Sequence, residues 1–370
     1  MLSGGADEGM RIFSCRVEMG SWVPGAGRAA ANAIARFSLA CFLAHARICR
    51  FTRLFTVCLT LLAAQWAAAA PLQNGFDLAD ALVPVEAIFA GGPPRDGIPA
   101  IDRPHFLPAS AAGDVQPQER VLGVSLNGVA KAYPIAILNW HEIVNDTFGD
   151  TPVAVTYCPL CGTGMVFLAQ VAGQAVQFGV SGLLYNSDVL LYDRQSASLW
   201  SQIDRRAISG KHKGQRLTAL PLEHTRWGDW RQRHPETLVL SRNTGHFRDY
   251  DRNPYAAYES EEELYFPVRF RAQGYHPKER VLGLEIDGQF KAYPFAELAK
   301  SAGTSGSIRD RVGGQPIVVH FDAENANATA RDADGKPLAG VVGYWFAWYA
   351  FHPETAIYRA ASQGAATGAH

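Results

Sequence analysis

The chain has 370 residues, of which 48% are hydrophobic and 19% are charged, so it can bury a sizeable core and is not an intrinsically disordered sequence. Its 34 lysines and arginines nearly balance its 35 aspartates and glutamates, and no dense basic run follows residue 53. This charge balance argues against nucleic acid as a partner.

The first 70 residues are predicted to be a start assigned too far upstream, followed by a secretory signal peptide. An uncharged run at 54–64 follows three arginines and leads into alanines before Pro71. This order is typical of a signal peptide, with the mature chain beginning at Ala70 or Pro71. An uncleaved signal anchor is the alternative, because the uncharged stretch approaches membrane-spanning length. We therefore expect an exported protein, periplasmic or secreted, with no other membrane segment.

Export leaves Cys158 and Cys161 as the only cysteines of the mature chain. The other four cysteines precede the predicted cleavage site: Cys15, Cys41, Cys49 and Cys58. Exported proteins pass through oxidising compartments, where cysteines are commonly paired in disulfides. A closely spaced pair at Cys158 and Cys161 is therefore open to three interpretations: a metal site, a redox dithiol or a stapling disulfide.

Residues 71–117 form a lead-in rich in proline and glycine, with one short helix predicted at 78–89. An internal duplication follows. The segment 119–123 (ERVLG) returns at 279–283, and 131–134 (KAYP) returns at 291–294, in both cases 160 residues later. The Asn-Gly and Asp-Gly pairs between these motifs predict two β-hairpins with type I′ turns.

Each predicted hairpin leads into a short helix, at 135–144 and 295–300, and then into an apolar strand, at 152–157 and 316–321. A third match, Trp230 with His-Pro-Glu-Thr, returns at Trp348 only 118 residues later. The first copy therefore carries an insert of about 46 residues. The insert is predicted to form strands at 165–179 and 189–201, and a helix is expected at 227–233.

These patterns predict an α+β, β-rich fold of mainly antiparallel hairpins with short helices, in two internally repeated halves. The predicted parts are a first repeat with the CxxC motif and insert, a connector, a second degenerate repeat and a tail: 118–245, 246–278, 279–360 and 361–370. Neither a dinucleotide-binding glycine motif nor a phosphate-binding loop is present.

Several long motifs resemble one known family. They are YCPLCGTG at 157–164, the NSD, YDR and WSQ segments of the insert, and TGHFRDY at 244–250. With the repeats, they are similar over about residues 115–358 to the exported prokaryotic family catalogued as domain of unknown function 3179. The resemblance implies an exported protein but transfers no catalytic role, so function must be argued from the residues.

Comparison of the two copies separates folding residues from candidate site residues. Motifs kept in both copies, including HPET and its histidines, are explained by turns, strands and caps. The cysteines occur in the first copy alone, where Cys158 and Cys161 align with Asp322 and Asn325. His141 likewise aligns with a serine and threonine stretch at 301–305.

For a metal site, two thiolates supply half of a tetrahedral zinc shell, and His141, His246 or Asp188 would have to complete it. Copper(I) is softer and needs fewer ligands, so zinc and copper both remain open. A redox dithiol is less favoured, because no thioredoxin-like pattern surrounds the pair and the following Gly-Thr-Gly breaks the helix that would stabilise a thiolate.

Polar residues of the insert and of the following motif are candidates for binding a small ligand. These are Asn186, Asp188, Asp193, Arg194 and Arg248. Two other classes of function stay open. A binding module would have an inert disulfide and an aromatic groove fed by 344–349, and a hydrolase would need a nucleophile such as Ser187 beside an acid-base pair.

Overall fold

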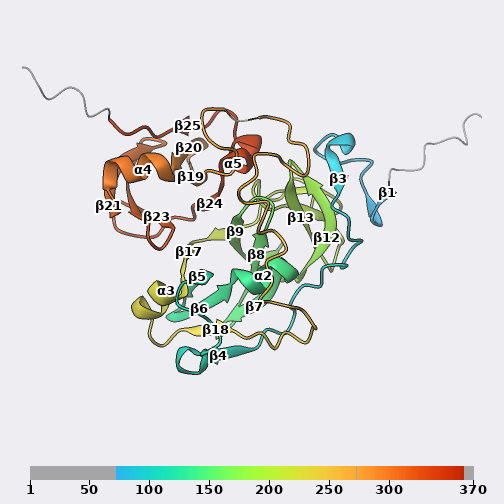
Figure 1. The fold of residues 1–370 in the computed structure, drawn as a ribbon. Coiled ribbons are helices and arrows are strands. Elements are labelled where there is room, and N and C mark those ends of the chain that lie inside the picture. The colour runs from blue at the N-terminus through green and yellow to red at the C-terminus, as the bar shows by residue number, and fades with distance from the viewer. Residues whose placement is uncertain (1–71, 272, 362–370) are drawn as a thin grey trace, which may run out of the picture. The chain divides into compact units, whose positions relative to one another are not determined.

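The computed structural model describes residues 72–271 and 273–361, and these residues form a β-rich α+β fold (Figure 1). The predicted fold class is confirmed. The predicted signal segment and residues 362–370 of the predicted tail lie outside the described residues. Within the described part of the chain, no helix is long and apolar enough to cross a membrane.

The first half begins with a hairpin and a helix that carry the first ERVLG and KAYP motifs. Its elements are β5 (Arg120–Leu126), β6 (Val129–Pro134), α2 (Ile135–His141), β7 (Ile143–Phe148), β8 (Thr151–Cys158), β9 (Thr163–Leu168), β16 (Ala219–Leu220), β17 (Glu223–Arg226), α3 (Trp227–Arg233) and β18 (Leu238–Leu240). Asn127 and Gly128 join β5 to β6 with φ angles of 53° and 78°, which is the predicted type I′ turn.

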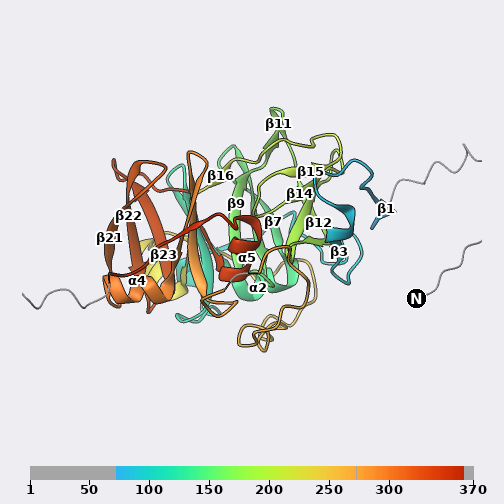
Figure 2. The ribbon, with the colours of Figure 1, turned by 90° about the horizontal axis from the view of Figure 1, so that it is seen from above.

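The second half has the same element order. It contains β19 (Arg280–Ile286), β20 (Gln289–Pro294), α4 (Phe295–Ala302), β21 (Ser305–Val312), β22 (Gln315–Asp322), β23 (Asn327–Asp332), β24 (Val341–Tyr344), α5 (Trp345–Phe351) and β25 (Ala356–Ile357). One sheet in each half has the corresponding strand order, β17-β5-β6-β18-β4 and β24-β19-β20-β25. The second sheet of this half is β21-β22-β23, against which α4 lies (Figure 2).

The KAYP motif ties the two sheets of each half together. The Nζ atom of Lys131 donates to Asp146 of β7 at 2.8 Å, and the hydroxyl of Tyr133 donates to the same carboxylate at 2.6 Å. In the second half, Lys291 pairs with Asp310 at 2.6 Å. Burying an ion pair is tolerable when further hydrogen bonds satisfy the charges. The shared motif is therefore explained by folding.

The repeated tryptophan has a structural role of the same kind. Trp230 Nε1 donates to Thr237 Oγ1 at 2.9 Å, which places the indole ring over Gly123. Trp348 covers Gly283 in the same way. A Cβ atom at either glycine would overlap the ring. The tryptophan, the threonine of HPET and the glycine of ERVLG thus form one packing unit in each half.

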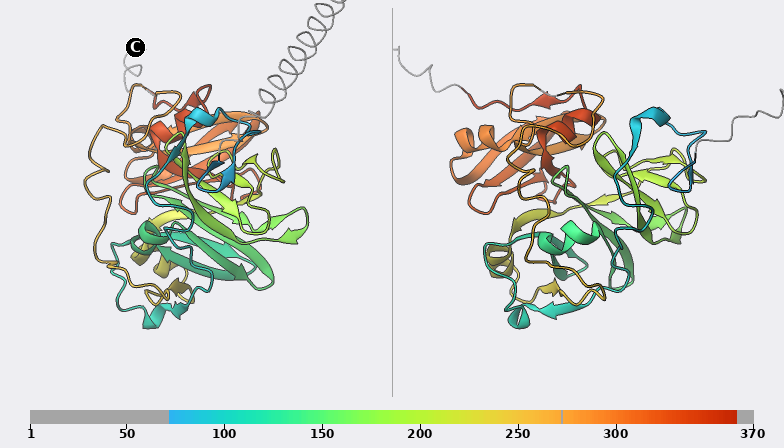
Figure 3. Two further views of the ribbon diagram at one scale, coloured as in Figure 1. Left: turned by 90° about the vertical axis from the view of Figure 1, so that its right-hand side faces the viewer. Right: turned by 45° about the vertical axis from the view of Figure 1, so that its right-hand side comes forward.

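The insert adds a sheet of its own, shown beside the lead-in in Figure 3. The order is β15-β14-β13-β12-β3. Its strands are β12 (Phe178–Tyr185), β13 (Asp188–Asp193), β14 (Leu199–Ser201), β15 (Ala207–Ser209) and, from the lead-in, β3 (Ile88–Ala90). The small hairpin of β10 (Gln170–Val171) and β11 (Gln174–Ala175) precedes them.

The helix predicted at 78–89 is wrong. Only a 3-10 turn at Val85–Ala87 forms there, because the next residues extend as β3 and pair with β12. Other lead-in strands are β1 (Leu72–Gln73), β2 (Phe76–Asp77) and β4 (Phe106–Pro108), and a second 3-10 turn spans Ala109–Ala111. Pairing with distant strands has overridden the local helical pattern. Between β18 and β19, the described residues of the connector contain neither helix nor strand.

Candidate metal centre

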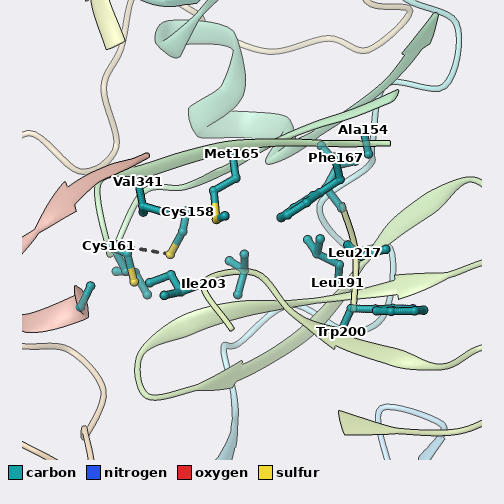
Figure 4. Packing of buried hydrophobic residues seen from close by; sticks show 14 of the residues in the cluster. Ala154, Cys158, Cys161, Met165, Phe167, Leu191, Trp200, Ile203, Leu217 and Val341 are labelled. Atoms are coloured by element: carbon teal, nitrogen blue, oxygen red, sulfur yellow. Dashed lines mark hydrogen bonds between the residues drawn. The ribbon is translucent and has the colours of Figure 1, made fainter. Parts of the chain in front are cut away.

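The CxxC motif forms a tight turn between β8 and β9. Cys158 is the last residue of β8 and pairs with Thr163, the first residue of β9. The backbone N–H of Cys161 donates to Cys158 Sγ at 3.3 Å, and Figure 4 shows the two side chains close together in the core. Gly162 has a φ angle of 60°, and a Cβ atom there would meet the ring of Tyr344. The glycine is therefore required by both backbone and packing.

The same turn exists in the second half without sulfur. Asp322 ends β22 and pairs with Asn327, and the N–H of Asn325 donates to Asp322 Oδ1 at 3.1 Å. Ala326 has a φ angle of 50°, like Gly162 in the first half. The turn therefore forms without cysteines, and the two thiols of the first half are not needed to build it.

The insert brings Asp188 to the two cysteines. Asp188 begins β13 after a two-residue turn in which Asn186 and Ser187 have φ angles of 52° and 64°. The side chain of Asn186 fixes this turn, because it donates to the carbonyl of Ala350 at 3.0 Å and accepts from the N–H of Arg269 at 2.9 Å. Asn186, a predicted ligand-binding residue, is thus placed as an anchor of the turn.

Cys158, Cys161 and Asp188 form one fully buried cluster. One ligand atom from each residue lies within 4.8 Å of those of the other two, and all three residues are 0% exposed. Both cysteines are free thiols. The thiol of Cys161 is 3.3 Å from the carbonyl oxygen of Ser187, in position to donate to it. Two sulfurs and one carboxylate are a donor set suited to a metal ion such as zinc.

Burial makes ionisation of this cluster unfavourable. Desolvation raises the pKa of both thiols, and it raises the pKa of Asp188 from 3.8 to about 7. Glu142, which ends helix α2, has its pKa raised from 4.5 to about 8 by burial and by the charge of Asp188. A bound cation would reverse the balance, because it stabilises thiolates and carboxylates.

Several polar atoms around the cluster lack a hydrogen-bond partner. Asp188 Oδ2 accepts from the N–H of Ile203 at 3.1 Å, whereas the buried Asp188 Oδ1 has no hydrogen bond of ordinary geometry in the described part of the chain, although the two thiols interact with this carboxylate. The hydroxyls of Ser187 and Ser201 and the Oε1 atom of Gln202 are likewise buried without a partner. Orphaned buried polar atoms are rare and often mark the place of an ion or water.

The structure does not bring His141 into this cluster. Its Nδ1 atom lies 2.8 Å from the carbonyl of Pro99, which can only accept, so Nδ1 carries the proton. Its Nε2 atom then accepts from the hydroxyl of Tyr250 at 2.7 Å. Burial lowers the pKa of His141 to about 4, so the ring is neutral. With both nitrogens engaged, His141 has no lone pair free for a metal. The ring of His246 lies 5.3 Å from that of His141, at an exposed position.

The remaining ligand-binding candidates lie apart from the cluster. Asp193 accepts from the N–H of Ser196 at 2.7 Å and from the indole of Trp200 at 3.0 Å, so it caps a turn. Arg194 pairs with Asp102 at 3.2 Å and lines a cavity of about 630 Å³. Arg248 donates to the carbonyl of its neighbour at 2.9 Å.

The residues that a hydrolase or a binding module would use do not form such a site in this structure. The hydroxyl of Ser187 has no hydrogen-bond partner among the described residues, so no base contacts it. Trp345, Phe346 and Trp348 are buried in the core, so the aromatic run packs the fold and does not form a groove.

Sequence reasoning passed over Glu142. The two-copy comparison could have found it, because the corresponding helix α4 ends at Gly303. A glutamate that takes the place of a helix-ending glycine departs from what folding favours.

Comparison with known proteins adds the family but no activity. No curated protein and no solved structure matches the chain. A family model described as "Protein of unknown function (DUF3179)" matches residues 95–355, more than half of the chain, so the protein belongs to that family, as its motifs predict.

Proposed function

We propose that this is an exported metal-binding protein whose centre is formed by Cys158, Cys161 and Asp188. The observation that carries the proposal is the cluster itself: two free thiols and one carboxylate, all fully buried, whose ligand atoms lie within 4.8 Å of one another. Three acidic groups at one dry position are costly without a cation. A divalent ion would offset two of the three negative charges that these groups carry when ionised.

The donor set favours zinc over copper. Copper(I) is satisfied by thiolates, and a carboxylate adds little to its affinity. Zinc accepts thiolate and carboxylate together, with Zn–S distances near 2.3 Å and Zn–O distances of about 2.0–2.2 Å. Three protein ligands leave the fourth tetrahedral position open, which is the arrangement of zinc sites that act on a bound water or substrate.

A dithiol that reacts with other thiols is less well supported. Such a cysteine needs a lowered pKa and access to its partner. Both thiols here are fully buried, and desolvation raises the pKa of each. Metal binding removes this difficulty because the ion itself drives deprotonation.

Metal analysis of protein purified from the exported compartment tests the proposal. We expect about one zinc per chain, retained through dialysis and removed by a strong chelator. The Cys158→Ser and Asp188→Asn variants should lose the metal, whereas Asp193→Asn, at the other end of β13, should keep it. Protein that stays metal-free after incubation with zinc and with copper(I) under reducing conditions would refute the metal centre.

Export is part of the same proposal and rests on the segment before Pro71. We expect the mature chain to begin at Ala70 or Pro71, which mass spectrometry of the exported protein can determine. An exported chain that still begins before residue 50 would contradict it.

A further inference from the structure

We propose that Glu142 faces the open fourth coordination position of the metal centre and holds the water molecule bound there. This inference rests on the proposed metal centre. It assigns Glu142 a positioning role, because it acts on the group that the ion binds and not on the ion itself.

The backbone of Glu142 is strained for a residue with a side chain. Its φ and ψ angles are 58° and −31°, outside the main regions that L-residues adopt. The residue that ends α4 in the second half is Gly303, which also has a positive φ angle, 70°, but a different ψ angle of −151°. Glycine would be the easier choice for folding in both places. Strain of this kind persists where the side chain serves a site.

Two backbone contacts hold Glu142 beside the cysteine turn. Its carbonyl accepts from the N–H of Tyr157, the residue before Cys158, at 2.7 Å, and its own N–H donates to Leu138 at 2.8 Å. The charge of Asp188 is close enough to raise the pKa of the Glu142 carboxyl. The backbone of Glu142 therefore lies opposite Tyr157, the chain neighbour of Cys158, and its carboxyl is within electrostatic reach of Asp188.

The carboxylate of Glu142 is buried but is not one of the proposed ligands. It is not a member of the group whose atoms lie within 4.8 Å of one another, so it is not a direct ligand in this arrangement. Like Cys158, Cys161 and Asp188, it is buried. Among the described residues, no donor hydrogen-bonds to its carboxylate. A water on the ion would supply that donor.

A carboxylate at this position has a measurable consequence. It accepts a hydrogen bond from bound water, and its charge repels an anion that competes for the same position. Replacing it by an amide of equal shape removes the repulsion and leaves the three ligands in place. A change in anion affinity at the fourth position is therefore evidence for the role of Glu142, because a residue that only supports the fold would not alter this affinity.

The test uses the full-length mature protein loaded with cobalt(II), whose visible spectrum reports coordination, and titrated with azide. We expect Glu142→Gln to bind azide at least about tenfold more tightly than the wild type. Glu236→Gln, an exposed glutamate far along the chain, removes the same charge and should leave azide affinity unchanged. Equal azide affinity in the wild type and in Glu142→Gln would overturn the inference.

A second variant keeps the inference testable if the first folds poorly. Glu142→Gly relieves the backbone strain, so we expect a raised melting temperature of the metal-free protein together with tighter azide binding. A lowered melting temperature with wild-type azide affinity would assign Glu142 a structural role and refute the inference. Failure of the wild type to bind cobalt(II) is a different result, because it would refute the metal centre itself.

Discussion

Replacing Asp188 by asparagine should stabilise the metal-free protein while abolishing metal binding. Asparagine keeps the shape of the side chain and an oxygen that can accept from Ile203, so the packing is preserved. It removes the charge that the fully buried aspartate acquires on ionisation. Most substitutions of a buried hydrogen-bonded residue destabilise a protein, so a gain would be diagnostic.

The size of the gain follows from the pKa of Asp188. Burial raises this pKa from 3.8 to about 7, and a change of that size corresponds to about 4 kcal/mol of stability. Because the folded state holds the proton more tightly, stability is present at low pH and is lost as the pH rises towards the folded-state value. At pH 8, Asp188→Asn should therefore gain up to about 4 kcal/mol, and at pH 4 less than about 1 kcal/mol.

Urea unfolding of chelator-treated, reduced protein at pH 8 and pH 4 measures both values. Asp193→Asn is the matched control, because Asp193 is equally buried in the same strand but accepts from Ser196 and Trp200. We expect that control to be destabilised by about 1–3 kcal/mol. If Asp188→Asn were destabilised by similar amounts at both pH values, Asp188 would be a structural acceptor and the reasoning would be wrong.

Five further substitutions test the site and the frame around it. Cys158→Ser and Cys161→Ser should each reduce the metal content, measured by elemental analysis, below a tenth of the wild-type value. Circular dichroism should show that both variants stay folded. A variant that keeps its metal would contradict the proposed ligand set. Lys131→Met should lower the free energy of unfolding in urea by about 3–5 kcal/mol, and Lys291→Met should lower it by less. The reason is burial, because the Lys131 side chain is 10% exposed and that of Lys291 is 20% exposed. Equal losses would show that burial is not the cause. Gly162→Ala should lower the unfolding free energy by about 2 kcal/mol or more, since it adds both an unfavourable φ and an overlap with an aromatic ring, and a neutral effect would show that the turn can relax.

Local patterns in the sequence were sufficient to predict most of the hairpins. The Asn127-Gly128 turn, the helix at 227–233 and the β-rich class all follow from short-range signals that the final structure keeps. Local signals failed at 78–89, where pairing of β3 with β12 decides the conformation. A strand that pairs with a partner almost a hundred residues away leaves no trace in its own few residues.

The candidate site could be predicted in part. The cysteines were found because cysteine chemistry is visible in any sequence, and Asp188 was among the alternatives because the insert is unusually polar. The sequence leaves His141 open as a ligand, because its hydrogen bonds to Pro99 and Tyr250 come from segments that no local pattern connects to it. Burial and hydrogen-bond satisfaction, which distinguish a ligand from a structural histidine, depend on the packed fold.

The two halves together show why the cluster is best explained by binding rather than by folding. In the second half, Asn325 donates through its side-chain amide to Asp322 at 2.8 Å, so the turn is closed by a satisfied polar pair. In the first half, the corresponding turn carries two buried thiols instead, and the insert, which the second half lacks, adds the buried Asp188 beside them. The second half shows that the turn needs no thiols, and the two thiols and Asp188 lie together at one place. An ion held at that place would offset the unpaired charges among them.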